Sequence, residues 1–227
     1  MRYEIHGTVF PTLEVYLSQG ESMYTESGGM AWMQGNIEMK TNTRGGLMKG
    51  LGRALAGESL FMTTYTSQDP EAMIVFTPEA PGRIVDVRLE AGQSLICQKD
   101  AFMCAEESVD IKIHFRKKLG AGFFGGEGFI LQQITGPGYA FLEIPGETRE
   151  YTLQAGEAMR IDPGHIAFFE PSVQYDIVAV KGIKNVLFSG EGLFLATLTG
   201  PGRIWLESMP LSNLAAKLAK YLPTKSS

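Results

Sequence analysis

The stretch GEGFILQQITGPG, residues 126–138, is written almost unchanged 64 residues later as GEGLFLATLTGPG, residues 190–202. A third, weaker copy, GESLFMTTYT, covers residues 57–66. Internal repetition decides the architecture before any single residue does, because each copy is expected to fold as the same supersecondary unit.

A second pattern brings the copies into register. The turns LSQGESM, LEAGQSL and LQAGEAM share a leucine, a central glycine and a closing apolar residue, and their glycines are Gly20, Gly92 and Gly156. The residues twelve positions after these glycines occupy one column of the aligned copies, and we expect them to face the core: Trp32, Cys104 and Phe168. The sequence therefore predicts three copies of one unit, over residues 8–80, 81–145 and 146–210.

Each copy has the composition of short β-strands. Segments such as FILQQIT, YAFLEI and REYTL are rich in aromatic or β-branched residues and are bounded by Gly, Pro or Asp. Short strands at regular spacing favour sandwiches or barrels. A unit of this size buries only about 60% of its unfolded surface, so we expect the three to pack together. We predict one all-β domain over residues 1–227, with its units arranged around a pseudo-threefold axis.

Two kinds of segment depart from the strand pattern. The chain end predicts a helix over residues 211–222, because Leu211, Leu214, Leu218 and Leu222 fall on one face and Pro223 follows. The glycine-rich segments 45–59 and 119–128 are apolar, and the second carries Phe123 and Phe124. Two interpretations of these segments stay open: a plug over the end of a sheet, or docking on a membrane surface or a partner.

Composition narrows the class of protein. Charged residues are 20% of the chain and the net charge is −5, so bulk electrostatics do not attract nucleic acid, although a local basic stripe could. No targeting segment and no run of 18 apolar residues is visible. The two cysteines, Cys97 and Cys104, stand in apolar surroundings, which is typical of buried thiols in a reducing compartment. We expect a cytoplasmic protein.

No residue is assigned to a catalytic, cofactor or metal site. The three histidines, His6, His114 and His165, form no His-x-His pair, and the cysteines form no CxxC motif. A triplicated acid, Glu58, Glu127 and Glu191, has two interpretations. It could converge on a cation or ligand near the threefold axis, or it could cap a turn.

Nucleic-acid binding by a repeat protein requires the same basic residue in every copy. Lys40 and Lys112 fall in one column, but the third copy has Asp176. The one basic cluster is HFRKKLG, residues 114–120. We interpret it as a solvated sheet edge.

The segment GGLMKGLGRALAGESLF, residues 45–61, the glycine turns, the paired GEG…TGPG blocks and the closing helix together resemble a known family. It is the bacterial branch of the family named for altered inheritance of mitochondria, also called TRAP-like. The resemblance covers nearly the whole chain. It implies a TRAP-like β-sandwich unit, similar to one subunit of the tryptophan RNA-binding attenuation protein. Since that protein forms rings, the resemblance also implies self-assembly.

These patterns favour a non-enzymatic, self-associating scaffold or binding protein of unknown ligand. We expect a homo-oligomer held by apolar surface of the glycine-rich segments and the C-terminal helix. A small-molecule or metal-dependent enzyme on a β-sandwich is the alternative, although an enzyme would normally break its internal symmetry at one site. An RNA-binding module, by analogy with the attenuation protein, is the second alternative.

Overall fold

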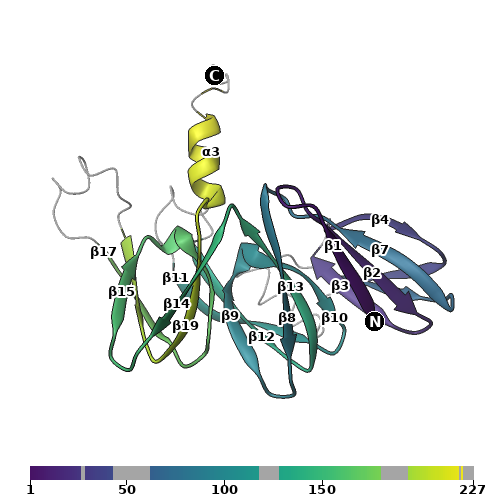
Figure 1. Cartoon of the computed structure of the whole chain (residues 1–227), viewed down its shortest axis with the longest axis horizontal. Coiled ribbons are helices and arrows are strands. Elements are labelled where there is room, and N and C mark those ends of the chain that lie inside the picture. Colours follow the sequence, from purple (N-terminus) through teal and green to yellow (C-terminus); the bar gives the residue numbers. More distant parts are fainter. Residues whose placement is uncertain (27–28, 43–61, 118–127, 180–193, 220, 222–227) are drawn as a thin grey trace.

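The protein is a row of β-sheets followed by one C-terminal helix (Figure 1). The computed structural model describes residues 1–26, 29–42, 62–117, 128–179, 194–219 and 221. These residues form four sheets. The prediction of an all-β protein closed by a helix is confirmed. The glycine-rich segments 45–59 and 119–127, with Phe123 and Phe124, lie outside the described residues, as do Glu58, Glu127 and Glu191.

The first sheet has the order β1–β2–β7–β4. Its strands are β1 (Arg2–His6), β2 (Thr12–Ser18), β7 (Glu71–Phe76) and β4 (Met30–Gln34). The second sheet has the order β5–β6–β3–β10–β13–β8. Its strands are β5 (Ile37–Asn42), β6 (Met62–Ser67), β3 (Ser22–Glu26), β10 (Phe102–Glu106), β13 (Gly138–Pro145) and β8 (Gly82–Leu89).

The third sheet has the order β11–β12–β9–β16–β19–β14, and the fourth β15–β18–β17. The strands of the third are β11 (Asp110–Lys117), β12 (Phe129–Thr135), β9 (Ser94–Gln98), β16 (Ile166–Phe169), β19 (Gly202–Glu207) and β14 (Thr148–Leu153). Those of the fourth are β15 (Ala158–Ile161), β18 (Phe194–Thr199) and β17 (Gln174–Ala179). Short 3-10 helices, η1 (Lys99–Ala101) and η3 (Pro163–His165), precede β10 and β16.

One pairing order recurs along the chain. We name the strands β2–β7 run one, β8–β13 run two and β14–β19 run three. In every run the sixth strand pairs with the first and the third, and the fifth pairs with the second and the fourth. The runs are joined where β3 pairs with β10 and where β9 pairs with β16. Each six-stranded sheet therefore combines half of one run with half of the next.

The glycine turns between the first two strands of each run are built alike. Gly20, Gly92 and Gly156 have φ angles of 83°, 81° and 79°, a left-handed conformation that glycine adopts without a Cβ clash. In the first turn the backbone N–H of Glu21 donates to the Ser18 carbonyl, while the Glu21 carboxylate accepts from the Ser18 N–H. The other two turns repeat both bonds, through Gln93 and Glu157.

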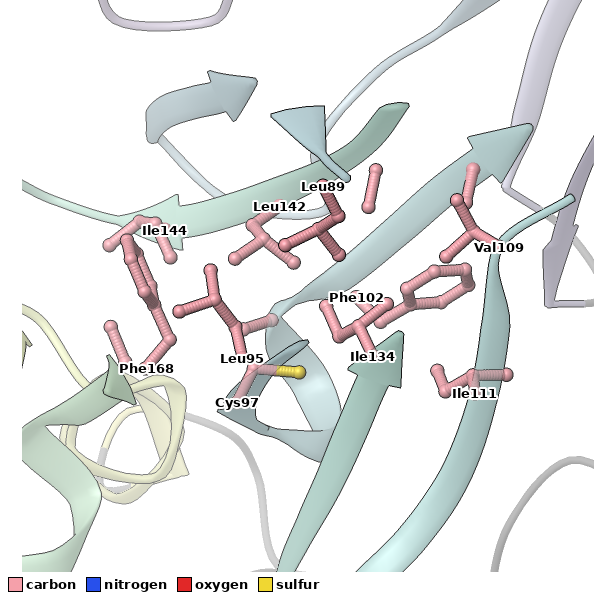
Figure 2. Close-up of a cluster of buried hydrophobic side chains, with 14 of the residues drawn as sticks. Leu89, Leu95, Cys97, Phe102, Val109, Ile111, Ile134, Leu142, Ile144 and Phe168 are labelled. Carbon is pink, nitrogen blue, oxygen red and sulfur yellow. The ribbon is translucent and has the colours of Figure 1, made fainter. Parts of the chain in front are cut away.

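The central core lies between the two six-stranded sheets. Leu89 and Leu142 reach into it from the second sheet and meet Leu95, Ile134 and Phe168 of the third (Figure 2). Packing across both faces explains why strands such as β13 are apolar on each side. Two smaller clusters fill the ends of the row, one mainly within run three and one mainly within run one, and run two contributes to both.

The predicted core column is only partly right. Cys104 and Phe168 are 0% and 2% exposed, but Trp32 is 48% exposed, so the expectation that Trp32 faces the core is wrong. The physical reason is the neighbouring strand. Cys104 on β10 is covered by β3 and Phe168 on β16 by β9, whereas β4 forms the end of its sheet. Cys97 is also buried and both thiols are free, as predicted.

The C-terminal helix α3 (Leu211–Ala219) forms within the predicted range of 211–222, of which residues 220 and 222 lie outside the described part. It stands away from the sheets in Figure 1, and none of its residues is buried. Leu218 is 54% exposed. Leu211 and Leu214 are partly buried, so the described residues cover the apolar face of α3 at its start and leave it open at Leu218.

Candidate functional site

Two surfaces of the described chain have chemistry that calls for a partner: the open edges of β4 and β15, and an acidic pocket beneath α3. The edges are understood from the two places where the same strands are paired. At the β3–β10 junction Thr25 lies opposite Cys104, and Tyr24 lies opposite Ala105. The Thr25 hydroxyl donates to the Met103 carbonyl at 2.6 Å, so this buried hydroxyl on the junction is satisfied.

The β9–β16 junction has the same register. Cys97 lies opposite Phe168 and Ile96 lies opposite Phe169. In both junctions, the residue five positions after a turn glycine meets the residue twelve positions after the next turn glycine. One rule of pairing thus joins run one to run two and run two to run three.

The strands that would continue this rule are open. Within the described part of the chain, β4 pairs with β7 alone and β15 with β18 alone. Figure 1 places β15 at one end of the row and β4 at the other. Strands β5, β11 and β17, the fourth strands of their runs, each lie at the end of a sheet, so every run has an open edge at this position. Strands β4 and β15 differ, because their counterparts in other runs are covered.

The β4 edge exposes apolar side chains that are buried elsewhere. Trp32 is 48% exposed and Met33 is 38% exposed. The residues that match Met33 in the other two runs, Ala105 and Phe169, are both 0% exposed. Strand β4 also has the same irregularity as β10 and β16. Its register against the sixth strand of the run shifts just before Trp32, as it does before Cys104 and Phe168. The backbone of β4 therefore has the shape of a strand that accepts a neighbour.

The acidic pocket has a volume of about 290 Å³ and lies beneath the start of α3. Its polar lining includes Gln98, Asp100 and Glu207, and Leu211 and Ala215 of α3 form part of its apolar wall. The pocket is therefore built where run two meets run three and where the helix begins.

Glu207 is the most buried acid of this pocket, at 7% exposed. Among the described residues no hydrogen bond or ion pair reaches its carboxylate. Burial, with a smaller effect from the charge of Asp100, raises the pKa of Glu207 to about 8. Its carboxyl group can therefore hold a proton near neutral pH.

Glu143 occupies the matching position on β13, since both acids stand five residues after the glycine that opens the strand. It is half-buried and accepts the Glu79 backbone N–H at 2.6 Å. Burial raises its pKa to about 7. The hydrogen bond from the Glu79 N–H opposes this shift, and the charges of Glu79 and Asp100 add to it. Neither acid was predicted as a site residue from the sequence. Their shared offset after the repeated TGPG blocks was the signal that could have identified them.

The structure does not bring the three histidines together. His6 lies on β1, 3.5 Å and 3.6 Å from the carboxylates of Glu4 and Glu14. The His114 ring is 5.9 Å from that of Tyr175, and His165 Nδ1 is 2.7 Å from the Glu207 carbonyl oxygen. Throughout the described ranges, no group of three His, Cys, Asp or Glu residues is arranged to hold a metal ion.

The basic residues considered from the sequence lie on the outermost strands. Lys40, Lys112 and Asp176 are on β5, β11 and β17, which are the fourth strands of the three runs. Lys117, in the basic cluster, donates a hydrogen bond to the Ile177 carbonyl, so its ammonium group already has a partner within the protein. The structure thus gives the third copy an acid where the first two have a lysine.

Among the described residues, no helix has the length and apolar character needed to cross a membrane.

The family model described as mitochondrial biogenesis AIM24 matches residues 3–209. An uncharacterised protein of Streptococcus pyogenes serotype M6 is 33% identical over 236 aligned residues, which cover 100% of this chain and 93% of that protein. A crystal structure of a Streptococcus pyogenes protein is similar with a TM-score of 0.79 and 27% identity, covering 97% of this chain and 99% of that one.

Proposed function

This chain belongs to the family described as mitochondrial biogenesis AIM24, and within that family we propose that it is a non-enzymatic, self-associating β-repeat protein that acts as a scaffold or binding module. Neither similar protein supplies an activity: the Streptococcus pyogenes relative is described as uncharacterised. The proposal therefore depends on the surfaces of this chain.

We interpret the three runs as copies of one TRAP-like sandwich unit. The recurring strand order, the three matching turns and the matching irregularities before Trp32, Cys104 and Phe168 support this interpretation. A pseudo-threefold arrangement requires three equivalent junctions. The described residues form two of them, β3–β10 and β9–β16. Strands β15 and β4, which would form the third, lie at opposite ends of the row (Figure 1), so closure around a pseudo-threefold axis within one chain stays a prediction.

The observation that carries self-association is the exposure of Trp32 and Met33 on an unpaired strand edge. An open edge with exposed apolar side chains is a template for pairing with another chain, and native proteins normally cover or charge such edges. Here the edge carries neither a lysine nor a proline. The exposed part of the apolar face of α3, at Leu218, is a second surface available to a neighbour.

The enzyme alternative is less well supported. Glu143 and Glu207 are the described groups best suited to proton transfer, because both have raised pKa values. They occupy matching positions in two runs, so they follow the repeat rather than interrupt it. The RNA-binding alternative is weakened by Asp176 in the lysine column and by the net charge of −5.

Multi-angle light scattering over a range of protein concentrations tests the proposal. We expect a mass that is a multiple of the 24.8 kDa chain. A mass of 24.8 kDa at every concentration would contradict self-association. Because α3 and the β4 edge are separate surfaces, a chain lacking residues 211–227 and a Trp32→Lys chain should be measured in parallel.

A further inference from the structure

We propose that strand β15 of one copy pairs antiparallel with strand β4 of the next copy, with Ile161 opposite Trp32, so that copies join head to tail. This inference rests on the proposed self-association and names its partner, a second copy of this chain. The chain carries both halves of the junction, and Figure 1 places them at opposite ends of the row.

The register follows from the two junctions that the chain already forms. Thr25 lies opposite Cys104, and Cys97 lies opposite Phe168. The next members of these two columns are Ile161, five residues after Gly156, and Trp32, twelve residues after Gly20. The adjacent pairs, Tyr24 with Ala105 and Ile96 with Phe169, are continued by Arg160 with Met33.

The two strands have the shape that such a pairing needs. Strand β4 carries the irregularity before Trp32 that β10 and β16 carry before their covered residues. Strand β15 pairs with β18 on one side only, just as β3 and β9 would if β10 and β16 were removed. Within the described residues, each strand thus presents one row of unpaired backbone N–H and C=O groups, β4 as the third strand of its run and β15 as the second, which are the two positions that pair at the internal junctions.

The side chains are compatible across the junction. The neighbouring strand would bury the apolar surface that Trp32 and Met33 now expose, just as Phe168 and Phe169 are buried at the internal junction. Arg160 is the one charged residue among the opposed pairs, so no like charges face each other. Because Arg160 replaces the apolar Tyr24 and Ile96, this junction is more polar than the internal two.

The contact is heterologous, since each copy uses a different surface on its two sides. A head-to-tail contact of this kind closes into a ring when the rotation allows and otherwise extends as a filament. In either case the four-stranded and three-stranded end sheets would merge into a sheet like the internal two. The copies would then present a continuous series of equivalent junctions.

Disulfide trapping tests the register. Trp32→Cys and Ile161→Cys are placed in one chain, and Met33→Cys and Arg160→Cys in another. Adjacent pairs in an antiparallel ladder alternate between two spacings, so the second variant supplies the geometry that the first lacks. Since Met33 and Arg160 are exposed, the second variant also avoids the risk that a change at the buried Ile161 impairs folding. A Gln34→Cys, Ile161→Cys chain is the out-of-register control.

We expect an oxidised ladder of covalent multimers from an in-register variant, reversed by reductant, and little from the control. A disulfide formed within single chains would overturn the inference in favour of internal closure. An assembled mass in light scattering with no ladder from either in-register variant would overturn the β15–β4 junction while self-association stands. Monomers with no ladder would overturn both.

Discussion

Strands β4 and β10 are the third strands of runs one and two, yet they have opposite surroundings. Strand β10 lies inside its sheet between β3 and β13, and its Cys104 is fully buried. Strand β4 has β7 on one side and an open edge on the other, and its Trp32 is half exposed. The difference teaches that burial of a repeated position is set by the neighbouring unit rather than by the strand that carries it.

The largest expected effect belongs to the covered member of this column in run three. Phe168→Ala should lower the free energy of unfolding by about 3–5 kcal/mol, because it removes a buried ring and leaves a cavity. The Phe168 ring stacks on that of Trp205 at a centroid distance of 4.5 Å, which the change would also abolish. Denaturant melts measure the effect, with Phe168→Leu as the milder control. A loss under about 1 kcal/mol would mean that the site relaxes around the change.

A second matched pair, Glu207 and Glu143, sharpens the comparison through pH. The pKa of Glu207 in the folded chain is about 8, above the ordinary 4.5, so folding favours its protonated form. That stabilisation is complete below pH 4.5 and is lost as the pH rises to about 8. Glu207→Gln should therefore raise the free energy of unfolding at pH 9 by about 2–4 kcal/mol and leave it nearly unchanged at pH 4.

Thermal or denaturant melts from pH 4 to pH 9 measure this dependence. The control is Glu143→Gln, whose effect should appear at a lower pH, because the pKa of Glu143 is raised only to about 7. Equal effects of Glu207→Gln at both ends of the range would show that packing, rather than the buried charge, determines the result.

The open member of the column should respond differently from Phe168. Trp32→Ala should lower the unfolding free energy of the single chain by about 1–3 kcal/mol, less than Phe168→Ala does, because half of the Trp32 surface is already in water. It should also reduce the assembled mass, since the exposed ring lies on the proposed junction. Light scattering and melts on the same samples separate the two effects. A Tyr221→Ala chain, changed at another exposed aromatic residue, serves as control.

The smallest effect is expected from removing residues 211–227. No residue of α3 is buried, so the free energy of unfolding should change by less than about 1 kcal/mol. The number of copies in the assembly should stay the same if the β4 and β15 edges hold them together. Dissociation of the shortened chain would instead assign the contact to α3, as the sequence alone suggested.

A feature of the fold could be predicted from the sequence when it depends on residues close together along the chain, and could not when it depends on distant ones. The turns at Gly20, Gly92 and Gly156 were identified correctly because their hydrogen bonds are local. The burial of Cys104 was predictable from its apolar neighbours. The exposure of Trp32 was not, because it depends on which strand lies beside β4, and that strand belongs to a different unit.

The candidate site was harder to predict for the same reason. From the local sequence Glu207 is expected at the exposed end of a strand. In the structure it is buried in a pocket that residues of η1 and α3 also line. The pairing of β3 with β10 likewise joins residues about 80 positions apart, which no short-range pattern specifies. Alignment of the three copies identifies which positions are equivalent, but only the structure shows which strand lies beside each of them.

The two native thiols give the internal junctions their own reporters. Cys104 lies on the β3–β10 junction and Cys97 on the β9–β16 junction, and both are fully buried. Burial raises the pKa of Cys97 to about 12 and that of Cys104 well above its usual value, so neither reacts as a thiolate while its junction is closed. Timed alkylation followed by peptide mass analysis would therefore record how often each junction opens, separately and in the unaltered chain.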